Sequence, residues 1–319
     1  MTERKPTKAE LAALDRRVKS SPISSLFRNF QGSPFAASPE RQAELNRFIT
    51  SLGTRIQLAW PGTAFRFQVA ENNGIYVGLN ALERLWAYTY GYYQSYAMAG
   101  NHPAGTLVNR DPAVVKLLKW AHTGAKLPVE KPWPSGTARP DLPTSGTELP
   151  IANEIFLMMS AWILLHELGH IIRQDSAYDM SPGGDAFNHT MEFAADKWAY
   201  RFLLDHWKSY STDEDVLLKR GIGIAFAICI LSADRYFKGG KTPSHTHPHP
   251  VDRLLRFFDY LETNHTAHAK AVSRIEHAAS ICLFGTVGPH LPTSATQQTF
   301  ASARACVEFL RQNFRPIAV

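Results

Sequence analysis

The most constraining feature of this chain is a long, strongly apolar segment that nevertheless contains three ionisable side chains close together. The segment runs from about Pro150 to Arg173, and its pattern predicts a helix. Within it stand His166, Glu167 and His170. Burying two imidazoles and a carboxylate in so apolar a helix is unfavourable unless a metal ion or polar partners replace the lost hydration. The segment therefore predicts a core helix with a polar site on one face.

The three ionisable side chains follow the pattern HExxH, in the sequence His166-Glu167-Leu168-Gly169-His170. Positions i and i+4 of a helix share a face, so the two imidazoles can reach one metal ion. Glu167 is turned by roughly 100° from His166, which places its carboxylate beside the ion. A base at that position can take a proton from a water molecule at the metal.

A catalytic zinc site of this kind needs a third protein ligand and leaves one position open for water. The extended pattern HExxHxxGxxH is absent, because Arg173 and Ser176 stand where its glycine and histidine would be. Glu192, on a separate predicted helix, is the favoured third ligand. Asp196, one turn later, is expected to accept the other N–H group of a ligand histidine. His189 is an alternative third ligand. If the site has no function, Glu192 and Asp196 are instead a solvated acidic pair on a helix surface.

A histidine-rich segment at 244–253 allows three interpretations, which its spacing does not separate. Three histidines alternate in it, namely His245, His247 and His249. They can form an independent metal-binding tract, or a solvated loop before the next helix. Alternatively, one of the histidines or Arg253 points into a cleft and stabilises the oxyanion that forms when water attacks an amide carbonyl.

The combination of HELGH, EFAAD and THPHPVDRL resembles the gluzincin-type HExxH zinc metallopeptidases, whose pattern is HExxH…ExxAD…THPxxxxR. The resemblance covers residues 153–260 and implies hydrolysis of peptide bonds by a zinc-dependent endopeptidase. Carried over by position, it implies metal ligands at His166, His170 and Glu192, the general base at Glu167, a supporting acid at Asp196, and His247 and Arg253 in the element that closes the site.

Among such enzymes the chain is most similar to the soluble bacterial Lit phage-exclusion peptidase group. Other members are embedded in membranes, whereas the apolar stretches Ile155–Leu165 and Gly221–Leu231 are too short to span a bilayer. The resemblance implies a cytoplasmic protease with a protein or peptide substrate, which by analogy alone is elongation factor Tu. It also implies activity that phage infection or stress triggers.

The rest of the chain predicts a predominantly helical α+β protein. Alternation at residues 65–69 and 75–77, around Asn72-Asn73-Gly74, predicts a β hairpin whose edge near Tyr76 could bind an extended substrate by strand addition. We expect an N-terminal helical lobe with this hairpin at residues 1–127 and a zincin-like helical catalytic lobe at residues 151–319. Between them, the Pro-rich residues 128–150 form a linker or a lid.

Composition restricts the remaining classes of function. The net charge of 34 − 28 = +6 is not gathered into a run of Lys and Arg, so nucleic-acid binding is not favoured. Three cysteines without CxxC spacing argue against a disulfide framework and a thiolate zinc site. The polar N-terminus has no apolar signal region. The alternative to an enzyme is a non-proteolytic regulatory or binding protein that keeps zinc as a structural ion, although such a site needs no base at Glu167.

Overall fold

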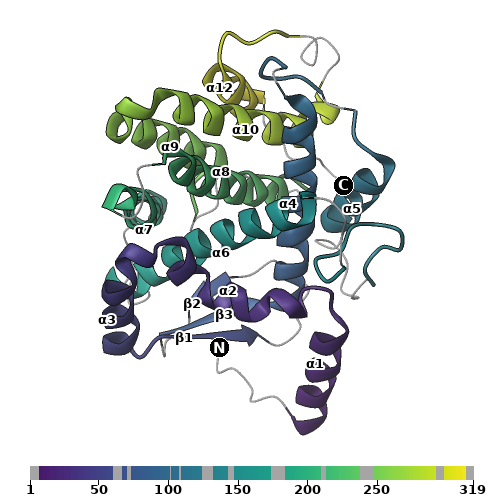
Figure 1. Cartoon of the computed structure of the whole chain (residues 1–319), viewed down its shortest axis with the longest axis vertical. Coiled ribbons are helices and arrows are strands. Elements are labelled where there is room, and N and C mark those ends of the chain that lie inside the picture. The colour runs from purple at the N-terminus through teal and green to yellow at the C-terminus, as the bar shows by residue number, and fades with distance from the viewer. Residues whose placement is uncertain are drawn as a thin grey trace.

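The computed structural model describes residues 7–59, 67–69, 73–100, 102–107, 109–123, 132–142, 147–173, 184–209, 213–237, 247–291 and 298–313. The protein is predominantly helical with one small sheet, as the sequence predicts (Figure 1). Its helices are α1 (Lys8–Ser20), α2 (Ser24–Ala37), α3 (Gln42–Leu52), α4 (Leu79–Ala99), α5 (Pro112–Thr123), α6 (Glu148–Arg173), α7 (Gly184–Leu204), α8 (Glu214–Phe237), α9 (Pro250–Asn264), α10 (Ala269–Val287) and α12 (Ala303–Asn313). The strands are β1 (Arg55–Ala59), β2 (Phe67–Val69) and β3 (Gly74–Gly78).

The predicted core helix is α6, and it runs through the middle of the molecule (Figure 1). It packs against α8, α7, α2 and α4. It also contacts β2 and β3, so the sheet lies beside it. Large side chains such as Phe156 and Trp162 are almost fully buried along it. A polar group on the buried faces of α6 therefore needs a partner from a neighbouring element or remains unsatisfied.

Two core helices also meet the length and composition of a membrane span. These are α6 and the Glu214–Ala233 part of α8, which corrects the expectation that their apolar stretches are too short. In the fold, 78% and 83% of their most apolar windows are buried inside the protein. Core helices of folded proteins have the same character, so these two helices give only weak support for a membrane span.

The predicted hairpin is present, but it belongs to a three-stranded sheet with the order β1-β3-β2. β2 pairs antiparallel with β3, and Asn73 at the turn has a φ of 57°, the left-handed conformation that Asn-Gly turns use. β1, which the sequence analysis did not predict, pairs parallel with β3. Tyr76 therefore lies on the central strand, between Gln57 and Gln68, and the prediction of a free edge there is wrong.

Two parts of the Pro-rich segment are described. Residues 147–150 include the start of α6, and residues 132–142 pack at the end of α6 opposite to the HExxH motif. Trp133 lies against Trp86 and Trp120, with ring centroids 5.7 Å and 5.0 Å away. Trp86 in turn donates a hydrogen bond to Asn153 on α6. Asn153 precedes His166 by about 20 Å along the helix axis. The linker or lid and the two-lobe division stay predictions, because residues 128–131 and 143–146 lie outside the described residues.

A buried ion pair joins the N-terminal part of the chain to the helices around the core. Arg220 on α8 donates from Nη1 to Glu40 at 2.7 Å and to the carbonyl oxygen of Leu203 at 2.6 Å. Both side chains of the ion pair are less than a tenth exposed. Beside them, the Arg41 guanidinium lies 3.9 Å from the centre of the Phe202 ring. These contacts hold the short helix Pro39–Arg41 against α7 and α8.

We predict that Glu40→Ala lowers the free energy of unfolding by about 3–5 kcal/mol, because Arg220 is left buried without its carboxylate. Urea unfolding followed by circular dichroism measures the loss. The matched control is Glu154→Ala, which removes the exposed pair that Glu154 forms with Lys219, the residue before Arg220. The control should lose at most about 1 kcal/mol. Equal losses in both variants would contradict the prediction.

Candidate metal centre and active site

The site begins with a close contact between α6 and α7 at the glycine of the HExxH motif. A Cβ atom added at Gly169 would lie 3.4 Å from Cα of Ala195 and 3.4 Å from the Trp198 ring. The missing side chain on α6 and the small one on α7 therefore let the two helices approach. This contact brings Glu192, one turn before Ala195, and Asp196, the residue after it, within reach of the histidines on α6.

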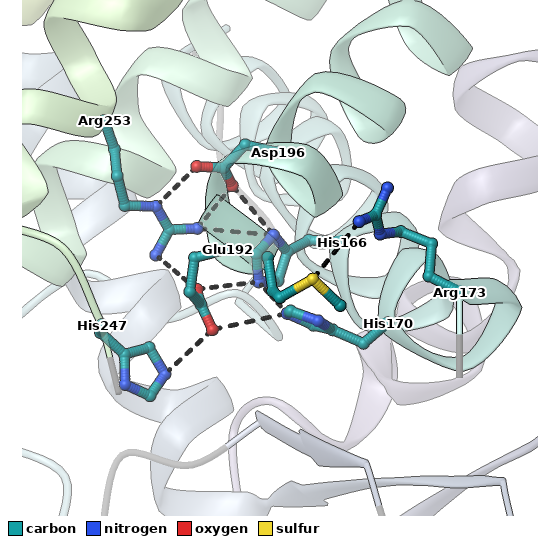
Figure 2. A network of polar contacts seen from close by, with 8 residues as sticks. His166, His170, Arg173, Glu192, Asp196, His247 and Arg253 are labelled. Carbon is teal, nitrogen blue, oxygen red and sulfur yellow. Dashed lines mark hydrogen bonds and ion pairs between the residues drawn. The ribbon is translucent and has the colours of Figure 1, made fainter. Parts of the chain in front are cut away.

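His166, His170 and Glu192 converge at this contact (Figure 2). The two Nε2 atoms of His166 and His170 lie 3.1 Å apart. Glu192 places Oε2 at 3.5 Å from Nε2 of His166 and Oε1 at 3.5 Å from Nε2 of His170. His166 and Glu192 are buried, and His170 is partly exposed. Among the described residues, the cluster whose ligand atoms lie within 4.8 Å of one another consists of these three, so the alternative ligand His189 is not part of it.

The spacing and the unsatisfied atoms of this cluster fit a metal ion. Metal–ligand bonds of about 2.0–2.1 Å at a tetrahedral angle separate ligand atoms by about 3.3 Å, close to the distances found. Oε2 of Glu192 is buried and accepts no hydrogen bond within the described structure. Nδ1 of His166 lies 2.9 Å from the Asp196 carboxylate and must donate its proton there, so Nε2 of His166 presents a lone pair to the cluster. The three residues can therefore hold a metal ion.

Asp196 and Arg253 form a buried pair behind the ligand histidine. Arg253 donates to Asp196 from Nε at 2.8 Å and from Nη2 at 2.6 Å. Its guanidinium also lies 5.4 Å from the centre of the Trp162 ring. Its Nη1 atom lies 3.8 Å from Oε2 of Glu192. The structure thus directs Arg253 at the carboxylates that surround His166, as Figure 2 shows. Asp196 in turn determines which nitrogen of His166 carries the proton.

The three carboxyl groups of the site have different proton affinities. Burial alone would raise the pKa of Glu192, but the adjacent imidazoles of His166 and His170 outweigh it and hold this pKa well below its ordinary value. Burial likewise opposes ionisation of Asp196, yet the charge of Arg253 and the hydrogen bond with His166 lower its pKa. For Glu167, burial raises the pKa, and the neighbouring histidines only partly offset it. The site therefore combines two stable carboxylates with one carboxyl group suited to exchange a proton.

Of the histidine-rich segment, His247 is the described residue that reaches the cluster. Its Nε2 lies 3.5 Å from Oε1 of Glu192, and its side chain is 56% exposed. His249 instead caps α9, where its Nδ1 accepts a hydrogen bond from the backbone N–H of Val251 at 3.1 Å. His245 lies outside the described residues. The structure therefore separates histidines that the sequence left equivalent.

Two aromatic side chains that the sequence analysis did not single out pack beside His166. Trp162, one turn before it on α6, has its ring centroid 5.7 Å from that of His166. Tyr200, one turn after Asp196 on α7, stacks on Trp162 with an interplanar angle of 10°. Trp162 lies four residues before His166, and Tyr200 lies four residues after Asp196, so the sequence does carry a signal of their position. Aromatic residues on helix faces usually belong to a core, however, and do not by themselves indicate a site.

The contact at Gly169 generates a prediction. Gly169→Leu should weaken metal binding by at least about tenfold, because the larger side chain separates α7, with Glu192, from the two histidines. Gly169→Ala is the control, since its Cβ only reaches ordinary contact distance and should change the affinity little. Competition with a chromophoric chelator measures the affinity, and circular dichroism verifies that both variants fold. Unchanged affinity in Gly169→Leu would show that the helix contact does not position the ligands.

Comparisons with known proteins identify the family of this chain. The family described as Peptidase U49 matches residues 75–273, more than half of the chain and all of the residues just described. The cell death peptidase of Escherichia coli (strain K12) is 30% identical over 249 residues, which cover 73% of this chain and 80% of that protein. No solved structure matches the chain. The chain therefore belongs to the Peptidase U49 family and is a peptidase that acts on a protein or peptide substrate.

Proposed function

We propose that this peptidase is a zinc-dependent endopeptidase that cleaves a specific intracellular protein. The observation that carries the proposal is the cluster of two imidazole nitrogens and one carboxylate, 3.1–3.5 Å apart, next to Glu167. Two nitrogen ligands and one oxygen ligand at near-tetrahedral spacing are typical of catalytic zinc, which keeps its fourth position for water. A zinc ion held there would lower the pKa of a water molecule and polarise the carbonyl group of the substrate.

In this proposal Glu167 transfers the proton. It follows His166 on α6, and it is partly exposed whereas His166 is buried. It accepts a proton from the attacking water and then donates it to the leaving amine. Burial raises the pKa of Glu167 and so makes its carboxylate a stronger base than an exposed one.

His247 and Arg253, which the sequence left as equal candidates for oxyanion stabilisation, take different roles in our proposal. His247 is exposed at the rim of the cluster and can donate an N–H group to the oxygen of the scissile carbonyl. Arg253 is buried and donates two hydrogen bonds to Asp196, so it is a positioning residue. It holds Asp196, and Asp196 holds His166 in the tautomer that binds a metal.

The relative's name supports a role that is switched on under particular conditions. That protein is called a cell death peptidase, and a peptidase inside its own cell has to spare most of the proteins around it. We therefore propose that this chain acts in the cytoplasm, on few substrates, after a trigger such as phage infection or stress. Elongation factor Tu is the substrate that the analogy offers.

The competing function, a binding protein with a structural zinc ion, makes different use of the same residues. A structural site closes all four positions with protein ligands, whereas three described residues form this cluster and one side carries the exposed His247. Such a protein would also lose nothing when Glu167 is replaced. Cleavage assays with variants of that residue therefore separate the two functions.

We predict that Glu167→Gln reduces peptide cleavage by about 10²–10⁴-fold, because the amide cannot accept the proton of the attacking water. Elemental analysis should find the same zinc content as in the unaltered protein, since Glu167 is not among the three clustered ligands. Glu148→Gln, an exposed change at the start of the same helix, should keep full activity. Full activity in Glu167→Gln would exclude Glu167 as the base.

The substrate can be found by comparing the same two proteins in a bacterial lysate. We expect new peptide N-termini, sequenced by mass spectrometry, with the unaltered protein and none with Glu167→Gln. Termini from elongation factor Tu would support the analogy with the Lit group. Identical termini in both samples, with and without a cell-stress or phage extract as trigger, would favour the binding protein with a structural ion.

We predict that Asp196→Asn lowers the affinity for zinc by about 10–100-fold, because an amide no longer requires His166 to carry its proton on Nδ1. The release of zinc to a chelator measures this change. Asp259→Asn, an exposed change on α9 whose carboxylate pairs with Arg304, is the control and should bind zinc as before. Unaltered zinc release from Asp196→Asn would remove Asp196 from the support of the site.

A further inference from the structure

A second site lies next to the metal cluster, in a cavity of about 520 Å³ between α7 and α9. Its α7 wall includes Phe193, Asp196, Lys197 and Tyr200, and Arg256 stands on its α9 wall. Asp196 is thus shared: it is a lining residue of the cavity, and its buried carboxylate contacts His166 of the cluster. The volume is within the range of about 300–1,000 Å³ that small-molecule sites occupy.

The carboxylates that line this cavity already have partners. Asp196 binds Arg253. Asp205 accepts hydrogen bonds from Arg201 and from the Tyr260 hydroxyl. On α9, a third carboxylate, that of Asp259, pairs with an arginine of α12. The negative charge of the lining is therefore compensated within the protein.

Two cations of the lining are not compensated in this way. Neither Lys197 nor Arg256 forms an ion pair in the described structure, and both are exposed. The Arg256 guanidinium lies 3.7 Å from the centre of the Phe193 ring, so one face of this planar cation covers an aromatic surface. The cavity accordingly presents two positive charges beside the aromatic rings of Phe193, Tyr200 and Tyr260.

We propose that this cavity binds a small organic anion, with a phosphate or carboxylate group on an aromatic body, and that the bound anion alters the metal cluster. The charged group pairs with Lys197 and Arg256, and the aromatic body packs on the rings of the lining. Thr263 and Asn264, also in the lining, can donate further hydrogen bonds. The effect on cleavage rests on the proposed function, whereas the binding does not.

Two contacts connect an occupant of the cavity to the ligand His166. The first is Asp196, which lines the cavity and lies 2.9 Å from Nδ1 of His166. The second is Tyr200, which lines the cavity and stacks on Trp162, whose ring is next to that of His166. The Tyr200 hydroxyl is buried and has no hydrogen-bond partner in the described structure, so a small shift can give it one. An anion that changes either contact changes the position or basicity of the imidazole.

Calorimetric titration of the zinc-loaded full chain with phenyl phosphate tests the binding. We expect a dissociation constant of about 0.1–1 mM, because so small a ligand makes few contacts. The double variant Lys197→Ala, Arg256→Ala should bind at least about tenfold more weakly. The matched control neutralises two exposed cations of α10, Lys270→Ala and Arg274→Ala, and should bind as the unaltered protein does. Absence of binding up to about 10 mM, or equal binding in both double variants, would overturn the proposal.

Two further measurements complete the test. Inorganic phosphate and benzyl alcohol should each bind more weakly than phenyl phosphate, and equal binding of inorganic phosphate would overturn the aromatic part of the proposal. Phenyl phosphate should change the rate of zinc release to a chelator about fivefold or more, but not in Lys197→Ala, Arg256→Ala. An unchanged rate despite binding would overturn the coupling. Neither the binding measurement nor the zinc-release measurement depends on peptide cleavage. Failure of the proposed protease activity is therefore detected separately, by the cleavage assay with Glu167→Gln.

Discussion

The hydrogen bonds of one buried carboxylate, Asp196, connect the three helices on which the site depends. Asp196 on α7 contacts His166 on α6 and accepts two hydrogen bonds from Arg253 on α9. A buried charge is tolerated when opposite charge and hydrogen bonds replace its hydration, and here both come from helices distant in sequence. The α6–α7 contact at Gly169 brings these groups within range of one another. Moving any of the three helices would leave a buried charge unpaired.

The apolar surroundings explain both the stability and the chemistry of this arrangement. Trp162, Tyr200 and Phe257 pack around the polar network and exclude water from its inner side. In such an environment the charge of Arg253 acts strongly enough to lower the pKa of Asp196, while the loss of hydration raises the pKa of Glu167. The outer side is different, since His170 is partly exposed and His247 is open to solvent. The cluster is therefore accessible from the side of His170 and His247.

Sequence reasoning succeeded where a pattern is local and failed where a partner is distant. HExxH on an apolar helix predicted the position of α6 and the shared face of His166 and His170, because helix geometry alone determines that face. The start of α5 is local in the same way, because Asp111, just before it, accepts a hydrogen bond from the backbone of Ala113. β1 was missed because its partner β3 is parallel and reached without a tight turn, so no turn signal accompanies it. α2 was missed because Gly32 and Pro34 lie within it, and tertiary packing outweighs their low helix propensity.

What the amino-acid sequence by itself determined is the set of chemical groups and their local geometry: two imidazoles one helical turn apart, a carboxyl group beside them and an acidic pair one turn apart on a later helix. Only the tertiary structure decided which distant groups meet. It brought Glu192 to the histidines, directed Arg253 at Asp196, and placed His247, not His249, at the rim of the cluster. It also formed the charged cavity behind Asp196 from residues of α7 and α9. The physical reason is that helix periodicity is a short-range property, whereas the approach of two helices depends on the packing of side chains from the whole core.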